Sequence, residues 1–93
     1  MRIFSGFYED LSLALNYYRE LAPSVGRSFI QEVNRALMQI ERFPASGHAV
    51  RELRMLRLNR FPYGIYYYLA VDGEPVALFL YHHKRDVRKD WPK

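Results

Sequence analysis

The stretch from residue 57 to residue 69, RLNRFPYGIYYYL, constrains the fold of this chain more than any other. Its first half continues an alternation of leucine with polar residues, which is the period of a half-buried strand. Pro62 cannot donate a ladder hydrogen bond, so we expect it in a turn between two strands or at the start of the second. Apolar side chains would then line both faces of that strand: Ile65, Tyr67 and Leu69 on one, Tyr66, Tyr68 and Ala70 on the other. The second strand is therefore predicted to lie at the centre of a sheet.

Two helical patterns precede this hairpin. From about residue 6 to 21, and again from about 25 to 42, apolar residues recur at alternating spacings of four and three, which is one stripe of an α-helix. The members of the two stripes are Phe7, Leu11, Ala14, Tyr18, Leu21 and then Phe29, Val33, Ala36, Ile40, Phe43. Ser5 is predicted to cap the first helix, and Pro44 and Gly47 mark the end of the second. The short break around Pro23 predicts a helical hairpin that covers one face of the sheet.

Short segments complete the expected fold, which is a single α+β domain over residues 1–93 in the order β-α-α-β-β-β. Residues 1–4 are apolar enough for a first strand, and residues 45–53 are expected to form a loop. Asp72-Gly73 predicts a tight turn before a last strand at about residues 75–81. In that strand Val76, Leu78 and Leu80 would share one face, and Ala77, Phe79 and Tyr81 the other.

The basic excess is confined to the second half of the chain. Residues 1–50 carry five basic and five acidic residues, whereas residues 51–93 carry nine basic and five acidic ones and thus the whole net charge of +4. Such a surface favours an anionic partner, either nucleic acid or an acidic protein segment, and a solubility bias would give the same count.

Several classes of protein are disfavoured by what the sequence lacks. It has no cysteine, which excludes disulfides and thiolate metal sites. Three histidines without clustered carboxylates predict no metal site, and no cofactor is expected. No apolar run approaches the ~20 residues of a membrane span, and residues 1–4 lack the apolar core of a signal peptide, so a cytoplasmic location is expected.

Three short motifs occur in a characteristic order: FPASG after the second helix, the RLNRFPYGIYYYL hairpin, and a closing HHKRD followed by Trp91. In this order and spacing the chain resembles, over essentially all of its length, the ParE branch of the ParE/RelE toxin superfamily. These are toxins of bacterial type II toxin–antitoxin, or plasmid stabilisation, modules. The resemblance implies a helical hairpin on a curved, mainly antiparallel sheet, and an antitoxin whose flexible, acidic and apolar C-terminal segment wraps the toxin.

The resemblance also implies one of two targets, because ParE toxins act on DNA gyrase whereas RelE-type members cut mRNA on the ribosome. An mRNA interferase needs cations on the scissile phosphate, a group that moves a proton, and an aromatic platform for a base. Those roles would fall to Arg57, His83, Arg85 and Trp91. However, Gly64 and Met55 stand where RelE-like enzymes carry an arginine and a lysine, which favours the ParE function.

The favoured hypothesis is thus a ParE-like toxin that inhibits gyrase by protein–protein contact, with a RelE-like mRNA interferase and an inactive antitoxin-binding member as alternatives. Its predicted target-binding surface comprises Arg57, Arg60, Lys84, Arg85, Arg88 and Trp91. For some single residues near the C-terminus a structural role is predicted instead. His82, in register with Leu80, is predicted to be a partly buried histidine that bonds to the backbone, and His83 is expected to be exposed. We interpret Trp91 as a hydrophobic anchor for the C-terminal segment in preference to a stacking platform.

Overall fold

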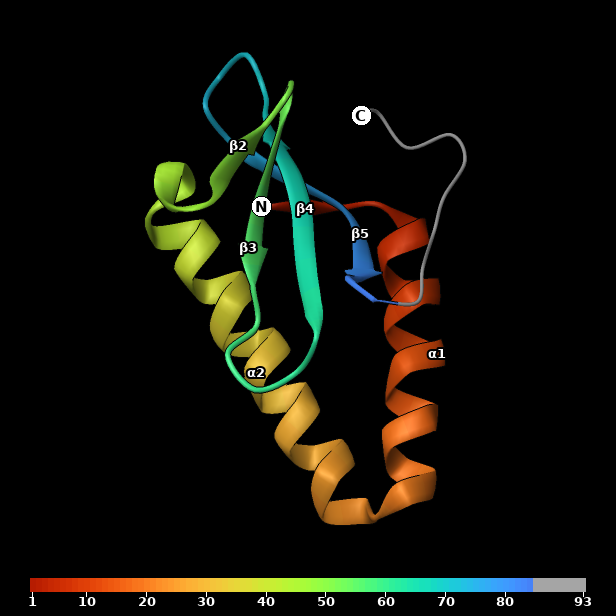
Figure 1. Ribbon diagram of the computed structural model, residues 1–93. Helices are drawn as coiled ribbons and strands as arrows, with labels where there is room; N and C mark the ends of the chain where they lie inside the picture. The colour runs from red at the N-terminus through yellow and green to blue at the C-terminus, as the bar shows by residue number, and fades with distance from the viewer. Residues whose placement is uncertain (85–93) are drawn as a thin grey trace.

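The computed structural model describes residues 1–84 and consists of a helical hairpin packed against a five-stranded sheet (Figure 1). In chain order the elements are β1 (Arg2–Ile3), α1 (Ser5–Leu21), α2 (Pro23–Arg42), the 3-10 turn η1 (Pro44–Ser46), β2 (His48–Val50), β3 (Leu53–Arg57), β4 (Tyr63–Leu69) and β5 (Pro75–His82). The strand order is β1-β5-β4-β3-β2, with β1 parallel to β5 and the other pairs antiparallel. The predicted α+β fold is confirmed, as is the central position of the strand after Pro62.

The two helices are separated by a single residue, Ala22, whose backbone serves both. Its N–H donates to the carbonyl of Tyr18 (3.1 Å) at the end of α1, while its own carbonyl accepts from Val25 (3.0 Å) at the start of α2. Pro23 can open α2 because the first helical position has no N–H to bond in any case. The predicted cap by Ser5 is wrong: Ser5 is itself the first helical residue, and no side chain caps α1.

The predicted helical stripes form most of the core. Phe7 on α1 and Phe29, Ala36 and Ile40 on α2 have no exposed surface. The last member of each stripe is the exception, because Leu21 and Phe43 are each 61% exposed. Leu21 lies at the hairpin end, beyond the sheet (Figure 1), and Phe43 has left helical geometry with ψ near 77°.

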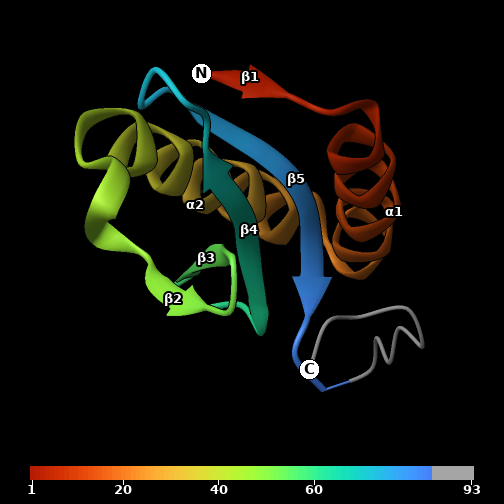
Figure 2. The ribbon, with the colours of Figure 1, turned by 90° about the horizontal axis from the view of Figure 1, so that it is seen from above.

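The predicted loop over residues 45–53 is wrong in part, since it contains the end of η1 and the edge strand β2. Three residues are too few to show an alternating pattern. The hairpin between β2 and β3 turns at Arg51 and Glu52, and Arg51 adopts a left-handed conformation (φ 55°). Figure 2 shows how strongly the sheet twists between β1 and β2.

A bulge in β5 corrects the predicted faces of that strand. Tyr66 pairs with Phe79 but Tyr67 pairs with Ala77, so Leu78 is an extra residue. The insertion places Ala77 in the core with Leu80 and moves Val76 to the opposite face. One inserted residue reverses the alternation, which explains why the simple pattern misassigned Val76 and Ala77.

The hydroxyl of Tyr67 ties the FPASG segment to the centre of the sheet. It donates to the Pro44 carbonyl (2.7 Å) and accepts from the Gly47 amide (2.9 Å), and the Tyr67 side chain is fully buried. A Cβ on Gly47 would lie 2.7 Å from the Tyr67 hydroxyl oxygen and 3.1 Å from the Met55 carbonyl oxygen. The glycine of this motif is therefore required for close approach.

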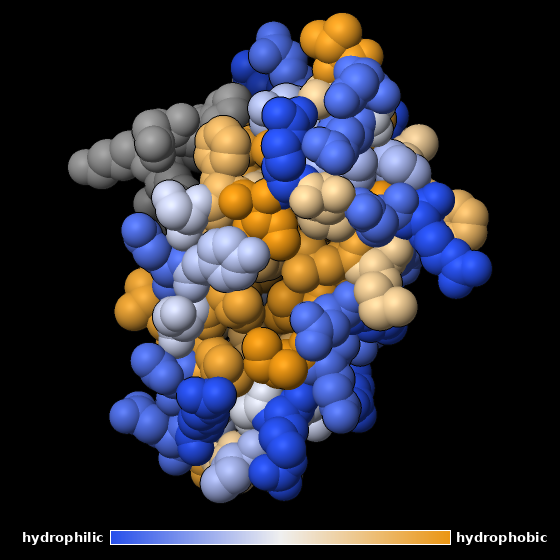
Figure 3. Space-filling view, turned by 180° about the vertical axis from the view of Figure 1, so that it is seen from behind, coloured by the Kyte–Doolittle hydropathy of each residue, from blue (hydrophilic) through white to orange (hydrophobic). Residues whose placement is uncertain are grey.

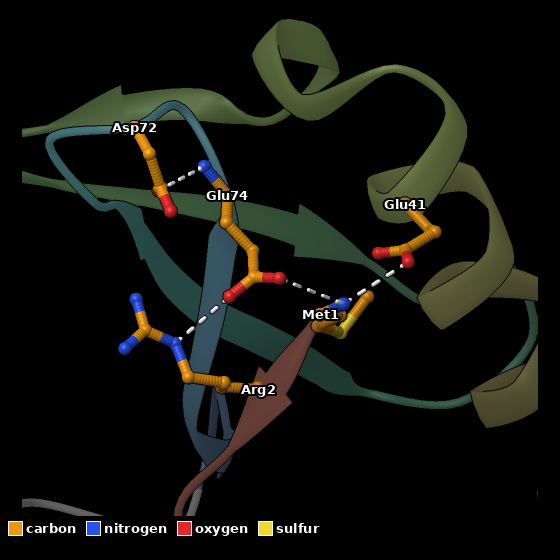
Figure 4. Close-up of polar contacts among 5 residues, drawn as sticks. All are labelled: Met1, Arg2, Glu41, Asp72 and Glu74. Atoms are coloured by element: carbon orange, nitrogen blue, oxygen red, sulfur yellow. Dashed lines mark hydrogen bonds and ion pairs between the residues drawn. The ribbon is translucent and has the colours of Figure 1, made fainter.

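A polar cluster fixes the short strand β1 (Figure 4). The Met1 amino group lies 3.0 Å from the Glu41 carboxylate and 3.8 Å from that of Glu74, and the Arg2 guanidinium lies 2.9 Å from Glu74. Asp72 in turn accepts from the Glu74 amide (2.9 Å). The hydrogen bond to Glu41 raises the pKa of the amino group. Such exposed pairs orient β1 and contribute little stability individually.

Candidate interaction surfaces

The sheet has one face toward the helices and a second, here called the outer face. Ile65 of β4 is paired with Leu80 of β5, and both side chains point into the core. The residues directly before and after each of them in the strand therefore point the other way. Toward the Arg57 end, the outer face of β3, β4 and β5 is formed by Met55, Arg57, Gly64, Tyr66, Phe79 and Tyr81, and His83 continues it just after β5. Within it, Tyr66 stacks on Phe79 (ring centroids 5.1 Å apart) and meets Tyr81 edge-on (5.8 Å). We refer to these three rings as the aromatic strip.

Arg57 lies at one end of this face. Its side chain is exposed, it faces Gly64 across the β3–β4 ladder, and it makes no ion pair within residues 1–84. Burial raises the pKa of Tyr66, and the nearby Arg57 charge opposes that rise. The guanidinium is therefore close enough to the aromatic strip to act on it electrostatically.

His83 is not exposed as predicted but half-buried on the outer face. Its Nε2 is buried and has no hydrogen-bond partner among residues 1–84, while its backbone N–H donates to the Pro62 carbonyl (2.9 Å). Burial, together with the charges of Arg57 and His82, lowers the pKa of His83. The imidazole is therefore neutral at neutral pH.

Gly64 explains the position of that imidazole. A Cβ at this residue would lie 2.8 Å from the Met55 sulfur and 3.0 Å from Nε2 of His83. The space of a side chain at position 64 is thus already filled by its two neighbours. A larger residue there would have to displace both.

The predicted surface does not form as a single face. Arg60 lies in the β3–β4 loop beside the first turns of α2, in a shallow pocket with Ser24, Ser28 and Phe61. Arg57 and Arg60 therefore lie on different sides of the molecule, because the turn at 58–62 carries the chain from the outer face back toward α2. Lys84 is exposed just after β5. Arg85, Arg88 and Trp91 lie outside the described residues.

The β3–β4 loop is held to α2 by Glu32. One carboxylate oxygen accepts from the Asn59 amide (2.7 Å) and the other lies 3.4 Å from the Arg35 guanidinium. Burial acts to raise the pKa of Glu32, but the hydrogen bonds from Asn59 and Arg35, with the charges of Arg35 and Arg60, outweigh it and lower the pKa.

His82 is structural, as the sequence predicts. Its side chain is 6% exposed, packs edge-on against Tyr63 (4.8 Å between ring centroids), and accepts from the Lys84 amide through Nδ1 (3.0 Å). This acceptor bond shapes the backbone that follows β5.

A groove between the helices escaped the sequence analysis. It has a volume of about 370 Å³ and is lined by Leu15, Arg19, Pro23, Gly26, Arg27 and Ile30. A Cβ on Gly26 would lie 2.7 Å from Cγ of Arg19, so glycine allows the helices to approach here. Seen from behind, the molecule presents an apolar area bordered by hydrophilic side chains (Figure 3). The missed signal was an aliphatic residue about one helical turn from an arginine in each helix, Leu15 with Arg19 and Ile30 with Arg27, hidden by the balanced charge of residues 1–50.

Residues 1–84 hold no group of three histidine, aspartate or glutamate side chains placed to share a metal ion. Neither helix in that range has the length and apolarity to cross a bilayer.

Comparison with known proteins gives the family. Residues 6–87 match the family described as "ParE toxin of type II toxin-antitoxin system, parDE". Among solved structures the fold is similar to a chain of the "Chromosomal ParDE TA system from P. aeruginosa", with a TM-score of 0.74 and 17% sequence identity over 87% of this chain and 91% of that one. No curated protein matches the chain. Because the family match spans nearly the whole sequence, the chain belongs to the ParE toxin family of type II toxin–antitoxin systems.

Proposed function

We propose that this chain inhibits DNA gyrase by protein–protein contact in the cytoplasm, catalyses no reaction itself, and is neutralised by a cognate antitoxin. The observation that carries the proposal is the packing around Gly64. RelE-like enzymes place an arginine at this position, whereas here Met55 and His83 fill the space beside the glycine. A phosphate on the outer face would therefore meet one strand cation, Arg57, where ribonucleolytic cleavage needs several.

One observation favours the interferase as a second candidate. Arg57 and His83 share the outer face, and the Arg57 charge contributes to the lowered pKa of His83. A neutral imidazole beside a guanidinium has the chemistry of a general base near a phosphate. Its Nε2, however, is buried against Gly64 rather than presented to solvent, which weighs against this role.

The interhelical groove supports the antitoxin part of the proposal. Its lining combines aliphatic side chains with Arg19 and Arg27, and neither arginine makes an ion pair within residues 1–84. An amphipathic segment that carries carboxylates beside apolar side chains would complement both features. The antitoxin segment inferred from the family has this composition.

Supercoiling of relaxed plasmid by purified gyrase tests the proposal. The protein should abolish supercoiling or trap a cleavage complex, and the antitoxin should reverse the effect. Arg57→Ala should weaken inhibition if the outer face contacts gyrase, and Arg42→Ala, an exposed arginine on α2, is the matched control. Full supercoiling at saturating protein would refute the gyrase proposal.

Programmed ribosomes separate the second candidate from the first. Codon-dependent cuts in mRNA that disappear in Arg57→Ala would establish the interferase, and intact transcripts would eliminate it. Induced expression adds the physiological readout: DNA-damage filamentation follows from gyrase inhibition and translational arrest from mRNA cleavage. Unaffected growth would identify an inactive antitoxin-binding member.

A further inference from the structure

Helix α2 carries a second stripe of residues beside the one that enters the core. The stripe repeats at spacings of three, four, three and four, and its members are Arg27, Ile30, Asn34, Leu37 and Glu41. Its aliphatic members are half-buried, whereas its three polar members are exposed. Side chains at this spacing form one continuous side of a helix, which is the kind of surface that packs against another helix.

The stripe faces the space between the two helices. Arg27 and Ile30 line the interhelical groove, and Glu41 contacts Met1 beside β1. The helices diverge from their junction at Ala22, so this space widens away from the groove (Figure 1). Figure 3 shows its apolar surface with a hydrophilic border. The facing side of α1 adds half-buried Leu11 and Leu15 and the 53% exposed ring of Tyr8. We call this surface the interhelical valley.

The two ends of the valley carry opposite charges. At its narrow end Arg19 and Arg27 make no ion pair within residues 1–84. At its wide end one carboxylate oxygen of Glu41 lies 3.0 Å from the Met1 amino group, while the other oxygen has no partner in the described part of the chain. An occupant that is acidic throughout would fit the first end and meet a like charge at the second. An occupant of the whole valley therefore needs a carboxylate at one end and a cation at the other.

A second copy of this chain meets that requirement when the two α2 helices run antiparallel. Asn34 is seven residues from Arg27 and seven from Glu41, which is about 10 Å along the helix in each direction. A twofold axis at Asn34 therefore brings Arg27 opposite the partner's Glu41, and it does so twice. The aliphatic members of both stripes then lie between the two charged contacts. Such a surface is self-complementary, as a twofold interface must be.

We propose that the free protein forms a twofold-symmetric dimer through the interhelical valley, with α2 packed antiparallel on α2 of a second copy and Arg27 paired with the partner's Glu41. Asn34 at the axis fixes the register, because a single polar residue within an aliphatic stripe disfavours shifted pairings. The dimer and an antitoxin segment bound in the interhelical groove exclude each other. The dimer goes beyond the proposed function and holds whether or not the chain inhibits gyrase.

Charge exchange tests the pairing. Sedimentation equilibrium of the purified full-length protein without antitoxin measures the dissociation constant of the dimer. Arg27→Glu should raise it by about tenfold or more, because two like-charge contacts replace two ion pairs. The double variant Arg27→Glu/Glu41→Arg exchanges the two charges and should restore the dimer. Arg42→Glu is the control: this exposed arginine lies about 100° around the helix from Glu41, and its reversal should leave the dimer unchanged.

A second variant tests the axis independently of the ion pair. Asn34→Glu places two carboxylates face to face and should also weaken the dimer, whereas Gln31→Glu, at an exposed position outside the stripe, should not. Circular dichroism of each variant establishes that the fold persists, and if Glu41→Arg unfolds the chain the Asn34 variant decides alone.

Three results would overturn the proposal. The first is a wild-type protein that is still monomeric at about 1 mM. The second is a dimer that tolerates Arg27→Glu or Asn34→Glu as well as it tolerates the two controls, which would place the interface elsewhere. The third is a folded double variant that remains as weakly associated as Arg27→Glu, which would show that Arg27 and Glu41 do not pair.

Discussion

Replacing Tyr67 by phenylalanine removes one oxygen that bonds two backbone groups of the FPASG segment. That oxygen donates to the Pro44 carbonyl at 2.7 Å and accepts from the Gly47 amide at 2.9 Å. The ring itself is fully buried, so its packing is retained in the variant. The substitution thus isolates the hydroxyl.

The magnitude follows from what the two backbone groups lose. The Gly47 N–H is buried and would be left without an acceptor, which costs about 1–3 kcal/mol. The Pro44 carbonyl is only part-buried and can turn to water, so its loss is nearer about 1 kcal/mol. The variant should therefore be less stable by about 2–4 kcal/mol, out of the roughly 5–14 kcal/mol expected for a domain of this size.

Urea unfolding followed by circular dichroism measures the loss. The midpoint should fall while the slope m stays constant, because the same surface is exposed on unfolding. Tyr68→Phe is the matched control: its side chain is half-buried on the neighbouring position, and its hydroxyl makes no hydrogen bond within residues 1–84. A Tyr67→Phe protein within about 0.5 kcal/mol of the control would refute the reasoning, since a lost buried hydrogen bond exceeds that value.

Three further substitutions test other parts of the structure. Gly64→Ala should destabilise by about 1–3 kcal/mol because its Cβ overlaps two packed side chains, whereas Gly6→Ala, whose Cβ would be 3.8 Å from its nearest neighbour, should not destabilise in the same thermal melts. Arg51→Gly should be neutral or stabilising by up to about 1 kcal/mol, since it removes the strain of a left-handed arginine; a clear loss of stability would show that its side chain contributes contacts. The pKa of Glu32 is lowered on folding, so its contribution is complete above the ordinary value of 4.5 and is lost as pH falls through the lowered pKa. Glu32→Gln should accordingly lose less stability than the wild type on acidification below pH 4.5, and parallel pH profiles would contradict this.

The helices and the meander could be predicted because their signals are local. The spacing of apolar residues alone predicts one buried face of α2, and the structure buries all four residues of that face: Phe29, Val33, Ala36 and Ile40. The aromatic run after Pro62 likewise identifies β4 as a strand buried on both faces. In each case the tertiary contacts agree with the pattern that the residues carry by themselves.

The wrong predictions, for the faces of β5 and the position of Arg60, arise where a bulge or a turn changes the direction of the backbone within a few residues. The extra Leu78 reverses the faces of β5, and no composition signal marks a bulge at an aliphatic residue. Arg60 does not share the face of Arg57 because the chain turns at Leu58 and Asn59, and the direction of a turn depends on bonds such as that between Glu32 and Asn59. That bond joins residues 27 apart in the sequence, so no local pattern can reveal it.

At Gly64, too, the sequence predicts only part of what the structure shows. The sequence identifies Gly64 as a position without a cationic side chain, but it cannot show whether the vacant volume is open to a ligand. The structure fills that volume with Met55 of β3 and with His83, which lies just after β5. Restoring an arginine at position 64 would therefore have to expel a thioether and an imidazole before its guanidinium could reach a phosphate. For this reason Gly64→Arg alone is not expected to confer mRNA cleavage, and a cleavage-active Gly64→Arg protein would show that the outer face is far more adaptable than its packing implies.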